Sequence, residues 1–275
     1  MSLLLLLLAA ATHVPVADAS GAATDSLDYG RLIDQAIDGG RVIQAETMLV
    51  QWQADPAPND KGGIEIAEAR LALAKGQDAD AETRFGALAQ AGMVDCRIDE
   101  GLGIARLRLG RAGQAAELLR RAVDHCGQSW RAWNALGVAY DASKSWALST
   151  AAYERAFQLT DRPVQVLNNY GLSLMAQGDA DKAVAIFDKA RQIAPDDARI
   201  ISNGDAALIR AGKDIERRAG DDPDSWAKRL GDAGQVALGM GDAVKARAYL
   251  SRAMTEAESY QPKAAAILAA MGATP

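Results

Sequence analysis

Small and bulky apolar residues recur along the chain at a step of 34 residues. Gly103, Gly137 and Gly171 mark one phase of this repeat. Three further columns share the step: small residues at Ala81, Ala115, Ser149 and Ala183, bulky residues at Phe85, Leu119, Tyr153 and Phe187, and apolar residues at Leu88, Ala122, Ala156 and Ala190. Small side chains let two helices approach closely, and bulky ones fill the space between them. Because self-similarity at this step is typical of stacked helical hairpins, the pattern predicts an all-α solenoid.

The repeat divides the chain into predicted structural units. The expected helical hairpins occupy residues 26–61, 62–95, 96–129, 130–163, 164–197 and 226–260, and a capping helix is expected at residues 261–271. Pro262 suits the first turn of that capping helix because this position needs no backbone N–H. The expected solenoid therefore accounts for residues 20–272.

One unit, at residues 198–225, departs from the pattern. Residues 198–212 predict a first helix, whereas residues 213–225 carry Gly, Pro and several Asp but no apolar stripe for a second one. An irregular connection is expected there. The sequence leaves open whether it is a flexible break in the solenoid or an ordered contact loop.

The unit at residues 164–197 matches a known repeat pattern. Its matching positions are Leu167, Tyr170, Gly171, Leu174, Ala183, Phe187, Ala190 and Pro195, and the preceding unit adds Trp133, Leu136, Gly137 and Tyr140. In this spacing the chain resembles tetratricopeptide repeat (TPR) proteins. The resemblance implies a right-handed superhelical solenoid of antiparallel TPR hairpins. It also implies that the first helix of each hairpin lines a concave face, where TPR proteins bind peptides or helices.

The resemblance assigns a set of residues to that concave groove. They are Arg97, Glu100, Leu107, Arg131, Asn134, Asp141, Gln165, Asn168, Asn169, Leu172, Met175, Arg199 and Asn203. Asparagine side chains both donate and accept hydrogen bonds, which suits the backbone of a bound peptide. A face that contacts only water would have a similar composition, so both interpretations stay open.

The first residues predict export. An unbroken apolar run from Leu3 to Ala11 is followed by Pro15 and by small residues up to Ala19. The run is too short for an ordinary membrane span, and the pattern is typical of a signal peptide at residues 1–19 that is cleaved after Ala19. No cysteine lies directly after the run, where a lipid would be attached, so lipid anchoring is not expected. The predicted location is the periplasm or another exported compartment, and the alternative is an uncleaved anchor.

The two cysteines, Cys96 and Cys126, fall at the start of the first predicted helix and at the end of the second one in the same unit. These positions lie at the same end of an antiparallel hairpin. In an oxidising compartment such a pair is a candidate disulfide. The alternative is two small apolar residues at helix ends.

The sequence offers no support for an enzyme or a cofactor. The motifs HExxH, GxSxG and GxxxxGK[ST] are absent, and His125 is the only histidine outside the predicted leader. We therefore expect no catalytic, metal or cofactor site. The net charge of −6 argues against binding to nucleic acid, which needs a basic face.

These features predict a non-enzymatic scaffold that binds a protein or peptide ligand in its groove. The leader and phrases such as VLNNYGLSLMAQGDADKAVAIF resemble TadD-like TPR proteins of Tad/Flp pilus assembly, which implies partners among the components of a pilus or secretion machine. Two alternatives stay open. One is an adaptor in envelope biogenesis or cell division, and the other is a non-catalytic subunit or chaperone of an exported enzyme.

Overall fold

The computed structural model describes residues 27–55 and 60–272, and all regular structure in these two stretches is α-helical. The predicted leader lies outside the described residues. The helices are α1 (Tyr29–Asp38), α2 (Val42–Ala54), α3 (Lys61–Ala74), α4 (Asp78–Gln90), α5 (Cys96–Arg108), α6 (Ala112–His125), α7 (Trp130–Ala142), α8 (Trp146–Leu159), α9 (Val164–Gln177), α10 (Ala180–Ile193), α11 (Ala198–Arg210), α12 (Pro223–Gly239), α13 (Ala243–Glu256) and α14 (Pro262–Gly272). The all-α superhelical prediction is confirmed.

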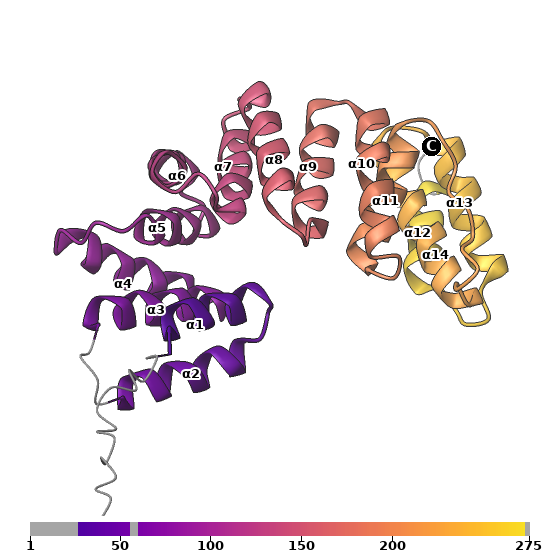
Figure 1. Ribbon diagram of the computed structural model, residues 1–275. Helices are drawn as coiled ribbons and strands as arrows, with labels where there is room; N and C mark the ends of the chain where they lie inside the picture. Colours follow the sequence, from indigo (N-terminus) through magenta and orange to yellow (C-terminus); the bar gives the residue numbers. More distant parts are fainter. Residues whose placement is uncertain (1–26, 56–59, 273–275) are drawn as a thin grey trace, which may run out of the picture.

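The helices form an arch of antiparallel pairs (Figure 1). Consecutive helices pack against each other, and the first helices of neighbouring pairs also touch, as in α3 with α5, α5 with α7, α7 with α9 and α9 with α11. An ion pair joins Asp38 of α1 to Arg131 of α7. Because this pair links the first hairpin to the fourth, the first helices line the inside of the arch.

Aspartate and serine side chains begin many of the helices. Asp60, Asp95, Asp179 and Asp242 each accept a hydrogen bond from a backbone N–H in the first turn, and Ser129 does the same at α7. Such caps satisfy donors that have no partner within the helix. Part of the acidic composition is therefore explained by helix capping.

The glycine column allows the two helices of a hairpin to touch. A Cβ added to Gly137 would lie 2.7 Å from the Tyr153 ring, and one added to Gly171 would lie 2.6 Å from the Phe187 ring. Real Cβ contacts are essentially never this short. Tyr153 and Phe187 are fully buried, so neither ring has free space to move into. Any side chain at these glycines must separate the paired helices.

The segment between α11 and α12 contains no helix, but it is held against its neighbours. Ile215 is buried in the C-terminal core. The Tyr249 hydroxyl donates a hydrogen bond of 2.7 Å to Asp214, and Lys245 Nζ donates one of 3.1 Å to the Lys213 carbonyl. Arg218 Nη2 donates to the Pro195 carbonyl at 2.6 Å. These contacts favour an ordered contact loop over a flexible break.

We expect Gly171→Ala to lower the free energy of unfolding by about 1–3 kcal/mol, because its Cβ overpacks against the Phe187 ring. Gly86→Ala is the matched control, since a Cβ there meets nothing within 4 Å. At Gly86, within α4, alanine should stabilise by about 0.5–1 kcal/mol through its higher helix propensity. Urea unfolding of both variants measures the difference. Equal effects of the two substitutions would contradict the role of the glycine column.

Tyr249 gives the C-terminal region a defined response to alkaline pH. Burial, together with the hydrogen bond donated to Asp214, raises the pKa of Tyr249 to about 12. The unfolded tyrosine ionises near pH 10. The folded state therefore keeps a proton that the unfolded state loses between about pH 10 and 12, so the contribution of Tyr249 is complete below pH 10 and declines above it.

We expect Tyr249→Phe to lower the free energy of unfolding at pH 8 by about 1 kcal/mol, because one hydrogen bond is lost. The variant should also lose less stability than the wild type between pH 8 and 11. Urea unfolding at both pH values checks this. The control is Tyr260→Phe, at a tyrosine that is 73% exposed. Parallel pH profiles for wild type and Tyr249→Phe would show that the hydroxyl makes no such contribution.

Candidate protein-binding groove

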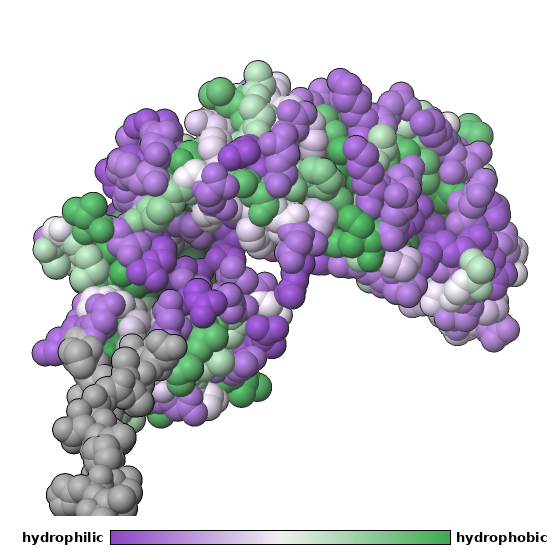
Figure 2. All heavy atoms as spheres, in the orientation of Figure 1, coloured by the Kyte–Doolittle hydropathy of each residue, from purple (hydrophilic) through white to green (hydrophobic). Residues whose placement is uncertain are grey.

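The groove positions assigned from the sequence lie on the first helices of four neighbouring units. Arg97, Glu100 and Leu107 belong to α5, Arg131, Asn134 and Asp141 to α7, Gln165, Asn168, Asn169, Leu172 and Met175 to α9, and Arg199 and Asn203 to α11. The face shown in Figure 2 is mostly hydrophilic, with apolar residues in small separate patches, and the molecule is hollowed between its two ends. The structure thus places the set on four first helices that pack side by side.

Four asparagines form a hydrogen-bonded row across three helices. Asn169 Nδ2 donates to Asn134 Oδ1 at 3.1 Å, which joins α9 to α7. Asn203 Nδ2 donates to Asn168 Oδ1 at 2.8 Å, which joins α11 to α9. Asn168 Nδ2 also donates to Asn169 Oδ1 at 3.4 Å. We call these four residues the amide row. Asn134 is buried, whereas the other three are half-buried. Each amide carries two donor hydrogens and two acceptor lone pairs, so the row links the helices, and its half-buried members keep capacity for a ligand.

A row of less polar residues runs beside the amide row at the 34-residue step. It consists of Ile104, Val138, Leu172 and Ala206, on α5, α7, α9 and α11. Leu172 is 40% exposed, and the other three are partly exposed. We call these four residues the apolar row. Only Leu172 was assigned to the groove from the sequence, although the regular step was a signal that could have identified the others.

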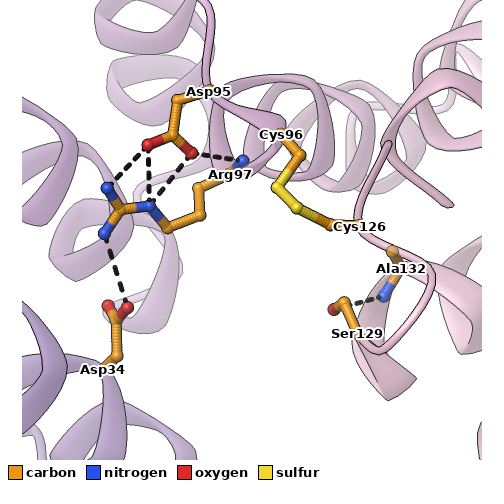
Figure 3. The surroundings of a disulfide bond; sticks show 7 residues. All are labelled: Asp34, Asp95, Cys96, Arg97, Cys126, Ser129 and Ala132. Atoms are coloured by element: carbon orange, nitrogen blue, oxygen red, sulfur yellow. Dashed lines mark hydrogen bonds and ion pairs between the residues drawn. A yellow bond between two sulfur atoms is a disulfide. The ribbon is translucent and has the colours of Figure 1, made fainter. Parts of the chain in front are cut away.

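The charged groove residues pair with one another at the N-terminal end. Arg131 contacts Asp38 and also lies 3.5 Å from Glu100 through its Nε. Arg97 Nη2 lies 2.6 Å from Asp95, and its Nη1 lies 3.6 Å from Asp34 (Figure 3). These side chains therefore connect α1, α5 and α7 and are not free charges awaiting a partner.

Asp34 lies at the centre of this charged group. Its Oδ1 is 3.0 Å from Arg70 of α3, in addition to the contact with Arg97. Burial raises the pKa of the Asp34 carboxyl, while the two arginines act in the opposite direction. The sequence did not point to Asp34, Asp38 or Arg70, because contacts that join different repeats leave no mark on the pattern within one repeat.

The remaining assigned residues differ in their surroundings. Arg199 is 67% exposed and pairs with Asp197, the N-cap of its own helix, at 3.0 Å. Gln165 is exposed and Met175 is half-buried. Asp141 accepts hydrogen bonds of 2.7 Å from Tyr153 and Ser173, so its carboxylate ties α7 to α8 and α9. Gln165, Leu172 and Arg199 are thus the most accessible assigned positions.

The geometry offers contacts for a polypeptide. The apolar row can take apolar side chains, and the amide row can bind backbone N–H and C=O groups. Within residues 27–55 and 60–272, no group of three or more His, Cys, Asp or Glu side chains is placed to hold a metal ion. In the same stretches, no helix has the length and apolar character needed to cross a membrane.

A disulfide joins Cys96 to Cys126, with the two Cα atoms 6.0 Å apart (Figure 3). This distance lies within the usual range for such bonds. Cys96 is the first residue of α5, and Cys126 follows the last residue of α6. The bond therefore closes the open end of this hairpin, opposite its turn. It is the disulfide that the sequence offered as a candidate.

Comparisons with known proteins agree with this architecture. Tetratricopeptide repeat family models match residues 100–163 and residues 164–197. A search of curated protein sequences finds no significant match. The fold and groove define a superhelical helix-repeat protein. The repeats over residues 100–197 match tetratricopeptide repeats, and the chain has the TPR solenoid fold.

Three solved structures illustrate the similarity of fold. A tetratricopeptide repeat protein from Parabacteroides merdae ATCC 43184 is 14% identical, with 89% of this chain and 98% of that chain covered and a TM-score of 0.50. PilW, a type IV pilus biogenesis factor, is 14% identical over 87% and 96% of the two chains, with a TM-score of 0.52. The C-terminal part of a TPR repeat-containing protein from Cytophaga hutchinsonii is 14% identical over 85% and 97%, with a TM-score of 0.51.

The disulfide closes a loop with a sequence separation of 30 residues. We expect its removal to lower the free energy of unfolding by about 3.6 kcal/mol, because the unfolded chain gains the conformational entropy that the closed loop removed. The variant is Cys96→Ser with Cys126→Ser, compared with the wild type in urea. Reducing agent should destabilise the wild type by a similar amount and leave the double variant unchanged. Equal stability of oxidised wild type and double variant would show that the bond does not constrain the unfolded chain.

Proposed function

We propose that the protein is a non-enzymatic scaffold that binds another protein along its groove, as an exported assembly factor of a pilus or secretion machine. The observation that carries the binding role is the pairing of the amide row with the apolar row over successive first helices. The TPR fold supports this role, because TPR proteins are typically interaction scaffolds. The groove suits a protein segment better than a small molecule because it extends over several units.

Export is supported by two independent features. The first residues have the pattern of a signal peptide, and Cys96 and Cys126 form a disulfide. Structural disulfides persist mainly in oxidising compartments. The periplasm satisfies both features in a bacterial cell. A pilus role is supported by the TadD-like phrases and by the precedent of PilW, a pilus biogenesis factor with the same kind of solenoid.

We expect Leu172→Glu to weaken partner binding at least fivefold, because it places a charge in the middle of the apolar row. The matched control is Leu148→Glu on α8, where the leucine is 53% exposed compared with 40% for Leu172. Both variants should keep the helical content of the wild type. Crosslinking in native cells, followed by affinity capture and quantitative mass spectrometry, measures the partners that each form retains.

The identity of the captured partners tests the second half of the proposal. Pilus or secretion components that are lost from Leu172→Glu and retained by Leu148→Glu would support an assembly factor. Envelope-biogenesis or cell-division proteins with the same dependence would replace that role by an adaptor. Equal recovery from both variants would move the binding surface away from the groove.

A further inference from the structure

The glycine column is interrupted at Asp205. This residue follows Gly103, Gly137 and Gly171 at the same 34-residue step. In the regular units a side chain here would collide with the second helix of the hairpin. No second helix lies between α11 and α12, so a carboxylate fits. Asp205 is buried, and its two oxygens accept hydrogen bonds of 2.7 and 2.9 Å from Arg229 of α12.

Arg229 is held in place from several sides. Its Nη1 also donates to Asp221, and its guanidinium lies 5.2 Å from the centre of the Trp226 ring. Arg218 donates from its backbone to the same Asp221 carboxylate at 2.9 Å. Two arginines and two aspartates therefore meet where the missing helix would lie. They form a polar floor, and the Arg218 guanidinium also pairs with Asp196 at 2.9 Å.

Above this floor lies a cavity of about 340 Å³ between α11 and α12. Small and aliphatic residues form its walls: Ala198, Ile201 and Ala206 from α11, and Ala233 and Val236 from α12. Ala206 is the last member of the apolar row, and Ser202, which also lines the cavity, precedes Asn203 of the amide row. The cavity is therefore continuous with the groove. Its volume is at the lower end of the range for ligand pockets, which suits one large side chain.

Two exposed lysines flank Asp232 at the mouth of the cavity. Asp232 lines the cavity and pairs with two lysines, Lys228 at 2.8 Å and Lys263 at 3.7 Å. The lysine side chains are 74% and 69% exposed. Asp232 is thus shared by two exposed ammonium groups, each of which keeps donor hydrogens for a second acidic partner. An acidic group that binds at this mouth would therefore find a complementary charge.

We propose that this cavity binds an aromatic side chain of the partner protein, immediately next to an acidic residue that faces Lys228 and Lys263. The ring would lie between the apolar walls and against the floor that contains Arg229, because a planar guanidinium interacts favourably with the face of a ring. This inference rests on the proposed function, since it identifies the kind of segment that the groove recognises.

The test uses the full protein and a synthetic hexapeptide, acetyl-Gly-Ser-Phe-Glu-Ser-Gly-amide. Methyl NMR follows Ile201 and Val236 of the cavity, with Ile98 and Val123 as distant references. We expect shifts confined to the cavity methyls, with a Kd up to about 1 mM. A peptide with alanine in place of phenylalanine should bind at least tenfold more weakly. A peptide with lysine in place of glutamate should also bind more weakly.

Variants of the protein test the two parts of the site separately. Ala206→Leu fills the cavity and should weaken the phenylalanine peptide at least tenfold. Lys228→Glu reverses a charge at the mouth and should weaken it about fivefold. Lys182→Glu is the matched control, because Lys182 is 73% exposed and pairs with Asp179 of its own hairpin in the same manner. It should bind like the wild type.

The outcomes separate this inference from the proposed function. Absence of shifts at Ile201 and Val236, or equal binding of the phenylalanine and alanine peptides, would overturn the cavity proposal. If Leu172→Glu still loses its cellular partners in that case, the groove function stands without the cavity. If the peptide binds as expected and Leu172→Glu keeps its partners, the cavity stands and the groove function falls.

Discussion

Close contact between the two helices of each hairpin is the constraint on which the rest of the structure depends. The bulky side chains Phe85, Leu119, Tyr153 and Phe187 are fully buried, and they reach that state because small residues face them. In residues 27–55 and 60–272, helix packing joins each unit to its neighbours, so no shared central core compensates for a lost contact. The regular step of the glycine column is therefore a requirement of packing.

Because each unit is stabilised by packing against its neighbours, the solenoid tolerates one incomplete unit. Where the second helix is missing, a buried ion-paired group around Arg229 and the segment that carries Ile215 take its place. A buried ion pair adds little net stability compared with apolar packing, but the loss of one partner leaves an uncompensated charge. We interpret the group around Arg229 as a device that fixes the position of α12 relative to α11.

The polar groove residues have a similar double role. The amide row and the Arg131–Glu100 pair connect neighbouring first helices, and Arg97 is held by Asp95 and by Asp34 of α1, so these side chains are already ordered before any partner arrives. Ordering side chains on binding costs free energy. A groove whose side chains are held in advance avoids part of that cost, which suits a scaffold that must bind a segment of another protein.

The sequence by itself determined the helical units, their order and the closeness of Cys96 and Cys126, because all of these follow from a period repeated within short stretches of chain. Only the tertiary structure decided which groove side chains pair with each other and where a cavity opens. Asp38 meets Arg131, and Asp205 meets Arg229, through the curvature of the solenoid and the packing of α12, which no repeat pattern specifies. The sequence also contains one signal that only the structure explains. Asp205 replaces glycine in the glycine column, in the unit that has no second helix between α11 and α12. The role of this aspartate depends on Arg229, which fills the space of the missing helix.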